Sequence, residues 1–311
     1  MIAIRWSFTV LLLACPLLAG AAEIEIDMPE DTIWYAHVDL EAMRVNPSGH
    51  RIYAWIDEEI GTDIREKAGI DLNTEVNRLT AYSDAANGTV VIAEGPLTKE
   101  SRERLLAMAT LEADGAIDVL DYKGMTYYHA GDEEDEEDRQ DDEPFDSLED
   151  SAWFSFASPD RAIMTSSREQ LQALLDNGGK IAGGGGHAGA LFVLSADKTF
   201  MQAGMQAENL AGEADDEWQS NILRNTKQAA VLVADKDGKI AVEARLIATE
   251  PRMAEALGGI INGLISLQAF NSDLTPEMQD VIRNTRVEVK DNSLSTNTVI
   301  DPDVVAAVLG D

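Results

Sequence analysis

Residues 76–93 read VNRLTAYSDAANGTVVIA, which is two strand-like runs separated by an Asn87-Gly88 dipeptide. The two runs, 76–83 and 89–93, are rich in β-branched and aromatic residues, which favour strands. Asn-Gly between such runs is a strong signal for a two-residue type I′ hairpin. A second hairpin of the same kind is expected over residues 229–248, around Asp237-Gly238. These two stretches predict an antiparallel sheet.

The elements around these hairpins follow one order, which occurs twice along the chain. That order is strand, helix, hairpin, helix, hairpin, helix. In the first half the elements are expected at residues 32–40, 52–68, 76–93, 98–111, 117–130 with 153–165, and 167–175. In the second half they are expected at residues 190–196, 199–209, 229–248, 251–267, 287–300 and 302–309. We therefore expect an α+β fold with two similar halves, each an antiparallel sheet with helices packed on one face.

Two stretches of unusual composition divide the chain. Residues 178–189 (GGKIAGGGGHAG) are typical of a flexible glycine-rich linker, so we place the boundary of the halves there, with units 23–177 and 190–311. Thirteen of the 19 residues from 132 to 150 are Asp or Glu. Such a dense run of like charge repels itself and offers little apolar surface, which predicts a disordered acidic insertion over residues 131–150.

The first 22 residues resemble a secretory signal peptide, with Arg5, an apolar stretch over residues 8–18 and small residues at 19–22. The apolar stretch is too short to span a membrane. Leu12-Leu13-Ala14-Cys15 also resembles a bacterial lipoprotein signal, in which Cys15 would carry the lipid. The two alternatives, a secreted or periplasmic protein and a lipoprotein anchored at Cys15, both remain open. Cys15 is the only cysteine, so no disulfide framework is expected.

The charge balance excludes some partners. The chain has 57 acidic and 24 basic residues and a formal net charge of −33. Such a chain is repelled by nucleic acids and by anionic membrane surfaces. The acidic run has no internal glycine and no alternating ligand pattern, so any calcium binding there would be weak and diffuse. We expect no bound cofactor.

Several segments are similar to those of uncharacterised exported bacterial proteins of unknown function. The similar segments are DTIWYAHVD (31–39), AGIDL (68–72), VNRL (76–79), the hairpin near residues 122–128 and the strand pair with its helix over 153–175. The resemblance covers most of the chain after the signal. It implies a two-half α+β protein of the bacterial envelope, and it implies no activity and no site residues.

No catalytic or metal-binding signature stands out. Tyr35, His37 and Asp39 alternate along one strand, so an oriented base is one reading and the polar face of a strand, with Asp39 in a cap, is the favoured one. The other histidines, His50, His129 and His187, are scattered without zinc spacing. We therefore expect neither an enzyme nor a metal site.

The most apolar segment after the signal is the predicted helix at residues 253–270. Leu257, Ile260, Ile261, Leu264, Ile265 and Leu267 cover nearly all of its sides, with Gly258, Gly259 and Gly263 allowing close approach, which usually indicates a buried helix. The functional alternatives are that Leu257, Ile260, Ile261 and Leu264 line a cavity for a lipid-like ligand or dock a partner. We therefore expect a non-catalytic envelope protein that binds a partner protein, with a periplasmic carrier of a hydrophobic ligand as the alternative.

Overall fold

The structure is a computed structural model that describes residues 32–84, 88–112, 117–131, 151–158, 160–181, 189–201, 224–269 and 274–309. The strands are β1 (Thr32–Asp39), β2 (Arg78–Asp84), β3 (Gly88–Glu94), β4 (Ile117–Tyr122), β5 (Met125–Gly131), β6 (Ser151–Ser155), β7 (Arg161–Thr165), β8 (Ala190–Asp197), β9 (Thr226–Lys236), β10 (Lys239–Ala248), β11 (Arg286–Lys290) and β12 (Ser293–Ile300). The helices are α1 (Leu40–Val45), α2 (Pro47–Ile56), the π-helix η2 (Asp57–Gly61), α3 (Thr62–Ala68), α4 (Lys99–Glu112), α6 (Arg168–Asp176), α9 (Pro251–Gln268), α10 (Pro276–Arg283) and α11 (Pro302–Leu309).

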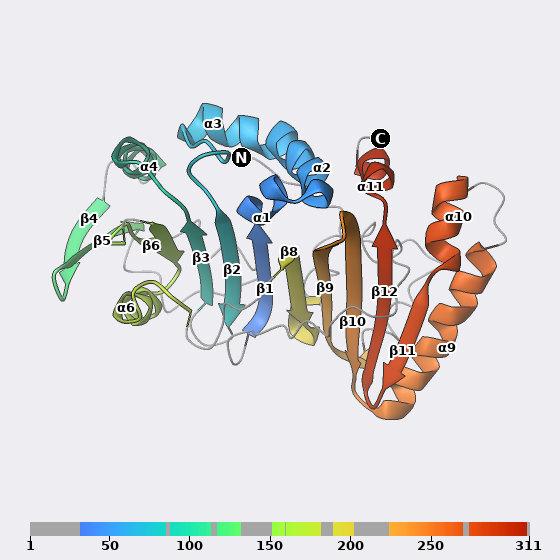
Figure 1. Ribbon diagram of the computed structural model, residues 1–311. Coiled ribbons are helices and arrows are strands. Elements are labelled where there is room, and N and C mark those ends of the chain that lie inside the picture. The colour runs from blue at the N-terminus through green and yellow to red at the C-terminus, as the bar shows by residue number, and fades with distance from the viewer. Residues whose placement is uncertain are drawn as a thin grey trace.

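The strands of the described residues form one sheet, in the order β11-β12-β10-β9-β8-β1-β2-β3-β7-β6-β5-β4 (Figure 1). Every pair of neighbours is antiparallel. The predicted α+β class is therefore confirmed. The expectation of one sheet per half needs a correction, because β1 pairs with β8 from Trp34↔Ala196 to Val38↔Phe192 and joins the halves. The pairing also satisfies the backbone N–H and C=O groups that an edge strand would leave exposed.

The halves grow outward from this central pair in the same way. In each half the first three strands follow in chain order, and the last strand of the half pairs with the third. Thus β7 lies beside β3, and β12 lies beside β10. The β4–β5 hairpin extends the first half only. This equivalence makes α4, which follows β3, the counterpart of α9, which follows β10.

The helices cover both faces of the sheet, which corrects the expectation of helices on one face. We call the two faces the Val38 face and the Tyr35 face, after adjacent positions of β1. Helices α1, α2, α10 and α11 pack their apolar side chains on the Val38 face, and α9 lies there over β11 and β12. Helix α6 lies on the other face, where Leu171, Leu174 and Leu175 share a core with Tyr35, Tyr82 and Trp153.

The hairpins form as predicted, with one difference at the Asn87-Gly88 signal. Lys123-Gly124 and Asp237-Gly238 have positive φ at both positions, as a type I′ turn requires. At the first hairpin, Gly88 pairs with Asp84 and belongs to β3, so three residues connect the strands instead of two. Gly88 has φ +86°, and a Cβ there would approach Ser166 Oγ to 2.2 Å. Glycine is therefore needed at the start of β3, where the backbone has positive φ and lies close to the Ser166 side chain.

Other predicted features have clear outcomes. Ser167 caps α6 by accepting a hydrogen bond from the Gln170 N–H, and α3 ends at Gly69 with φ +66°. Helix α10 was not predicted, although the Thr275 cap and Pro276 at the first helical position were a signal for its start. The signal segment with Cys15, the acidic insertion 132–150, and most of the linker and of the helix expected from residue 199 lie outside the described residues. None of the described helices is long and apolar enough to cross a membrane.

Candidate binding face on helix α9

Helix α9 begins at Pro251, whose fixed φ suits the first helical position and whose missing N–H would have no partner there. Glu250 precedes it as the N-cap residue and makes no side-chain capping bond. The helix then runs 18 residues to Gln268. Its interior contains glycines at 258, 259 and 263, each of which costs about 1 kcal/mol relative to alanine in a helix. Packing on one side must therefore offset a poor intrinsic helix propensity.

The inner side of α9 packs against the sheet. Ala254 is fully buried and Leu257 is 5% exposed. At Gly258 a Cβ would come within 2.7 Å of Val289 Cγ2 and 3.4 Å of a Leu294 methyl carbon. The glycine therefore lets the helix backbone approach β11 and β12 closely, and the strand side chains fill the space beneath it.

The outer side of α9 is apolar and open to solvent. Ile260 and Leu264 are each 40% exposed, and Leu267 is 70% exposed. The spacing of these residues, four and then three, places them in one row along the helix. Gly259 and Gly263 lie next to this row, and a Cβ on either would meet no atom within 4 Å. These five residues are named the outer face of α9 below.

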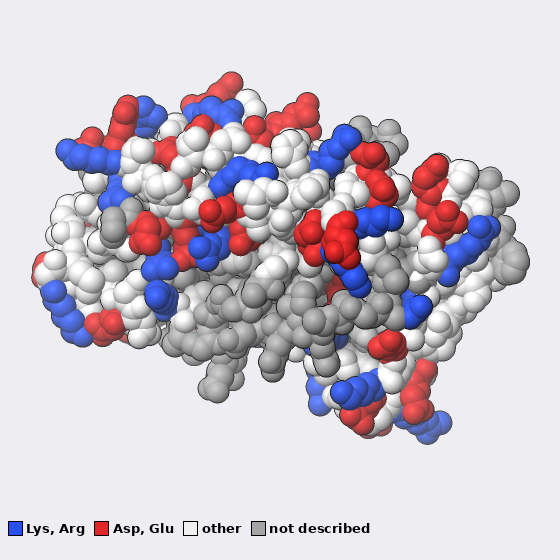
Figure 2. All heavy atoms as spheres, in the orientation of Figure 1, with Lys and Arg blue, Asp and Glu red and all other residues white. Residues whose placement is uncertain are grey.

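The outer face of α9 is also uncharged, on a highly charged chain. No Lys, Arg, Asp or Glu occurs in residues 256–272, although the chain carries a net charge of −33. Figure 2 shows uncharged surface along the right-hand side, where Figure 1 draws α9, beside charged clusters over α10 and the other helices. Monomeric proteins rarely expose contiguous apolar surface without a use for it.

The four predicted ligand-binding residues therefore divide between two sides of the helix. Leu257 lies in the inner packing, Ile261 is half-buried, and Ile260 and Leu264 lie on the outer face. The sequence also singled out Leu267, Gly259 and Gly263 on this helix, but it did not group them with Ile260 and Leu264 on one side. Their helical spacing relative to Ile260 and Leu264 was the available signal.

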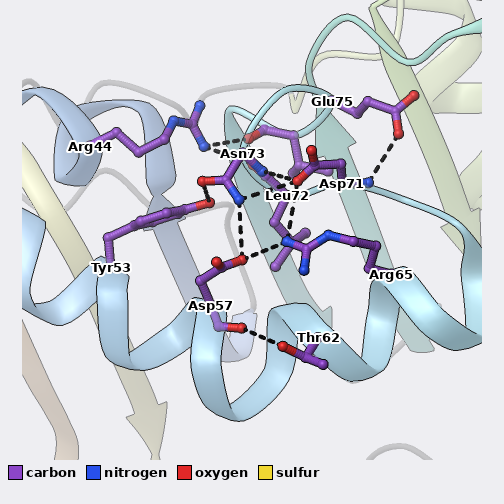
Figure 3. Close-up of polar contacts among 10 residues, drawn as sticks. Arg44, Tyr53, Asp57, Thr62, Arg65, Asp71, Leu72, Asn73 and Glu75 are labelled. Carbon is purple, nitrogen blue, oxygen red and sulfur yellow. Dashed lines mark hydrogen bonds and ion pairs between the residues drawn. The ribbon is translucent and has the colours of Figure 1, made fainter.

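A polar network joins the α2–η2–α3 helices to the loop before β2 (Figure 3). Asp57 Oδ1 accepts hydrogen bonds from Arg65 Nη2 at 3.0 Å and from Asn73 Nδ2 at 3.2 Å. Tyr53 donates its hydroxyl to Asn73 Oδ1 at 2.9 Å. A Cβ on Gly61 would crowd Asp57 Oδ1, so a larger residue there would push the Asp57 carboxylate out of this network.

The same network continues through Asp71 to Arg44. The Asn73 N–H donates to Asp71 Oδ1 at 3.0 Å, and this bond is the main cause that lowers the pKa of the Asp71 carboxyl. Arg44 donates to the backbone carbonyls of Leu72 and Val76. The charged groups of this network therefore bind mainly one another and nearby backbone groups. Such an arrangement holds the helices to the loop and leaves few charged groups to bind a ligand.

The Tyr35, His37 and Asp39 row forms no catalytic arrangement. Asp39 Oδ1 accepts a hydrogen bond from the Ala42 N–H at 2.7 Å and caps α1, as the favoured reading predicted. His37 Nδ1 lies 2.9 Å from Thr80 Oγ1, and Tyr35 is buried in the core.

A different row of polar residues crosses the edge of the sheet, and sequence reasoning did not find it. His129 is 2% exposed, its Nε2 lies 3.1 Å from Ser151 Oγ, and its Nδ1 lies 3.8 Å from Asp118 Oδ2. The order serine, histidine, aspartate resembles a hydrolytic triad. The Nδ1 distance is too long for a hydrogen bond, however, and the Ser151 side chain is buried between strands. His129 instead stacks on Trp153, with ring centroids 3.9 Å apart.

Metal-binding groups are absent from the part of the chain that the structure describes: no cluster of three or more His, Cys, Asp or Glu could hold an ion there. His187 and Cys15 lie outside that part, and His50 is exposed on α2.

The sequence matches no family model, and no curated protein is similar to it. Among solved structures, it is similar to crystal form III of TP0453, at 10% identity and a TM-score of 0.44, over 94% of this chain and 99% of that chain. Crystal form IV of TP0453 matches at 11% identity and a TM-score of 0.42, over 92% of this chain and 97% of that chain. At these scores the likeness carries no argument about function.

Proposed function

We propose that this chain is an exported bacterial envelope protein that binds a partner protein through the outer face of α9. The observation that supports binding is the exposure of Ile260, Leu264 and Leu267 together on a helix without nearby charge. Full burial of one such side chain contributes about 1.5–3 kcal/mol, so covering three partly exposed ones provides several kcal/mol for association. The signal-like first 22 residues support export.

A protein surface suits this face better than a lipid surface does. Helices that lie on membranes carry Lys and Arg along their polar side, where they meet anionic headgroups. The polar side of α9 carries Arg252, Glu255, Asn262 and Ser266, with no net positive charge. The chain's net charge of −33 adds repulsion from an anionic surface.

The carrier hypothesis has less support from α9. A carrier would need space along the helix for an apolar ligand, and the inner side is occupied by Val289 and Leu294. The outer side faces solvent, so a single lipid bound there would keep most of its apolar surface exposed to water.

A binding role is also proposed in place of catalysis. The one arrangement that resembles catalytic machinery, Ser151 with His129 and Asp118, keeps its hydroxyl buried. Ester hydrolysis by the purified protein that disappears in Ser151→Ala and His129→Gln would overturn this part of the proposal.

The test of binding is site-specific photo-crosslinking in the envelope of the cells that produce the protein. A benzophenone amino acid replaces Leu264, and the control carries it at Leu111 of α4, which is 79% exposed. We expect a discrete protein adduct from position 264 and none from position 111. An adduct of lipid mass, or no adduct at 264, would contradict the proposal.

A further inference from the structure

The outer face of α9 combines a ridge and a groove side by side. Ile260 and Leu264 are four residues apart and form the ridge. Gly259 and Gly263 are also four apart and form the groove, because no atom lies within 4 Å of the position of a Cβ on either. Rows of residues four apart are the ridges and grooves through which helices most often pack in globular proteins.

A ridge next to a matching groove is complementary to itself. If a second, identical helix is turned by a two-fold rotation, its Ile260–Leu264 ridge enters the Gly259–Gly263 groove of the first helix, and the reverse contact forms at once. This is the condition for a symmetric dimer, in which both subunits use the same patch. Packing of four-apart ridges on both helices sets a crossing angle near −50°.

Charge favours this same patch for self-association. Two copies that each carry a net charge of −33 repel one another, and contact through most charged surfaces adds close like charges. Contact through residues 256–272 brings no charged side chain of either helix into the interface. The nearest charged residues of α9 are Arg252 and Glu255, and Glu255 lies about one helical turn before Gly259.

We propose that the partner that occupies the outer face of α9 is a second copy of this chain, in a two-fold dimer whose α9 helices cross at Gly259 and Gly263. This inference rests on the proposed function, because it names the partner of the same face. A single pair of crossed helices buries less than the roughly 1,200–2,000 Å² of a stable interface. The dimer is therefore reversible, with a dissociation constant on the order of micromolar.

The test is sedimentation of the full chain without its signal segment, over about 1 to 300 µM so that a micromolar equilibrium is spanned. We expect a monomer at the low end and a dimer at the high end. Gly263→Leu fills the groove and Leu264→Glu places a charge on the ridge, so each should raise the dissociation constant at least tenfold. Leu111→Glu, on the counterpart helix α4, should leave it unchanged. Far-ultraviolet circular dichroism confirms that each variant is folded.

A second measurement locates the contact. The chain has one cysteine, Cys15, inside the signal segment, so Gly263→Cys gives the remaining chain a single thiol. A short bismaleimide should link two copies through Gly263→Cys and not through Leu111→Cys. A monomer at every concentration, or a dimer that Leu264→Glu leaves intact, would overturn the second-copy inference. If that monomer still gives a protein adduct from Leu264 in the envelope, the proposed function stands while this inference fails.

Discussion

Helices α4 and α9 occupy equivalent places in the two halves, and their solvent-facing sides differ sharply. Helix α4 carries the ion pairs Lys99–Glu103 and Arg104–Glu100, each four residues apart, on its exposed side. The exposed side of α9 instead carries Ile260, Leu264 and Leu267. Such ion pairs add only a few tenths of a kcal/mol each, but they keep a helix soluble. The exposed side of α4 thus carries ion pairs along its first turns and the single exposed Leu111, whereas the exposed side of α9 carries a row of apolar residues.

The two helices also begin differently. The Thr98 N–H and the Ser101 hydroxyl both donate to Glu75 Oε1, which ties the start of α4 to the loop before β2. Arg104 Nη1 donates to the Gly69 carbonyl at 3.0 Å and links α4 to the end of α3. Helix α9 has no side-chain cap at Glu250, and its inner side packs on β11 and β12. Polar contacts thus anchor α4, whereas apolar burial anchors α9.

The largest predicted effect separates the two sides of α9. Leu257→Ala removes a side chain that is 5% exposed and should lower the free energy of unfolding by about 2–4 kcal/mol. Leu264→Ala removes one that is 40% exposed and should cost less than about 1 kcal/mol in the monomer. Urea unfolding at a low protein concentration measures both. Equal losses would mean that the outer face of α9 is covered within the monomer.

The anchor of α4 should be sensitive to pH. Burial acts to raise the pKa of Glu75, but the hydrogen bonds from Ser101, the Asp71 N–H and Thr98 outweigh it and lower that pKa below 4.5. A carboxyl with a lowered folded-state pKa stabilises the fold above its unfolded-state pKa. That stability disappears as the pH falls through the folded-state value.

Glu75→Gln should therefore lower the free energy of unfolding by about 1–3 kcal/mol at neutral pH, because buried donors lose a charged acceptor. The difference in the free energy of unfolding between variant and native protein should become smaller as the pH falls below about 4.5. Urea unfolding across that pH range gives both values, and Asp280→Asn on exposed α10 is the control. A constant difference would show that the charge of Glu75 does not hold α4.

The sequence predicted elements whose cause is local. The hairpin turns follow from dipeptides such as Lys123-Gly124, and the start of α6 follows from the Ser167 cap. The continuous sheet was not predicted, because the β1–β8 pairing joins strands more than 150 residues apart and has no local signal. The division of α9 into a buried inner side and an exposed outer face was not predicted, for a similar reason. A helix apolar on all sides indicates burial, and only the position of α9 at the sheet edge leaves one side open.

The glycines of α9 offer a smaller and more specific test of the comparison with α4. Gly263→Ala fits open space and improves helix propensity, so it should raise the free energy of unfolding by about 0.5–1 kcal/mol. The added methyl group narrows the groove, so the same variant should weaken the dimer in sedimentation. Most stabilising changes leave binding unaffected. A variant that unfolds less readily but dimerises more weakly would therefore point specifically to the groove. A stabilised variant with unchanged dimerisation would show that the groove is not part of the contact.

The smallest expected effect comes from salt. If the dimer forms through uncharged α9, its main electrostatic term is the repulsion between two bodies of net charge −33. Raising the ionic strength from about 0.01 to 0.1 M shortens the screening length from about 30 to 10 Å and weakens that repulsion. The dissociation constant should then fall several-fold, as sedimentation at both salt concentrations would show, while that of Leu264→Glu stays above the native value at each salt concentration. A dissociation constant that rises with the salt concentration would mean that ion pairs stabilise the dimer. The contact would then lie on a charged surface like that of α4, and the difference between the two helices would have another cause.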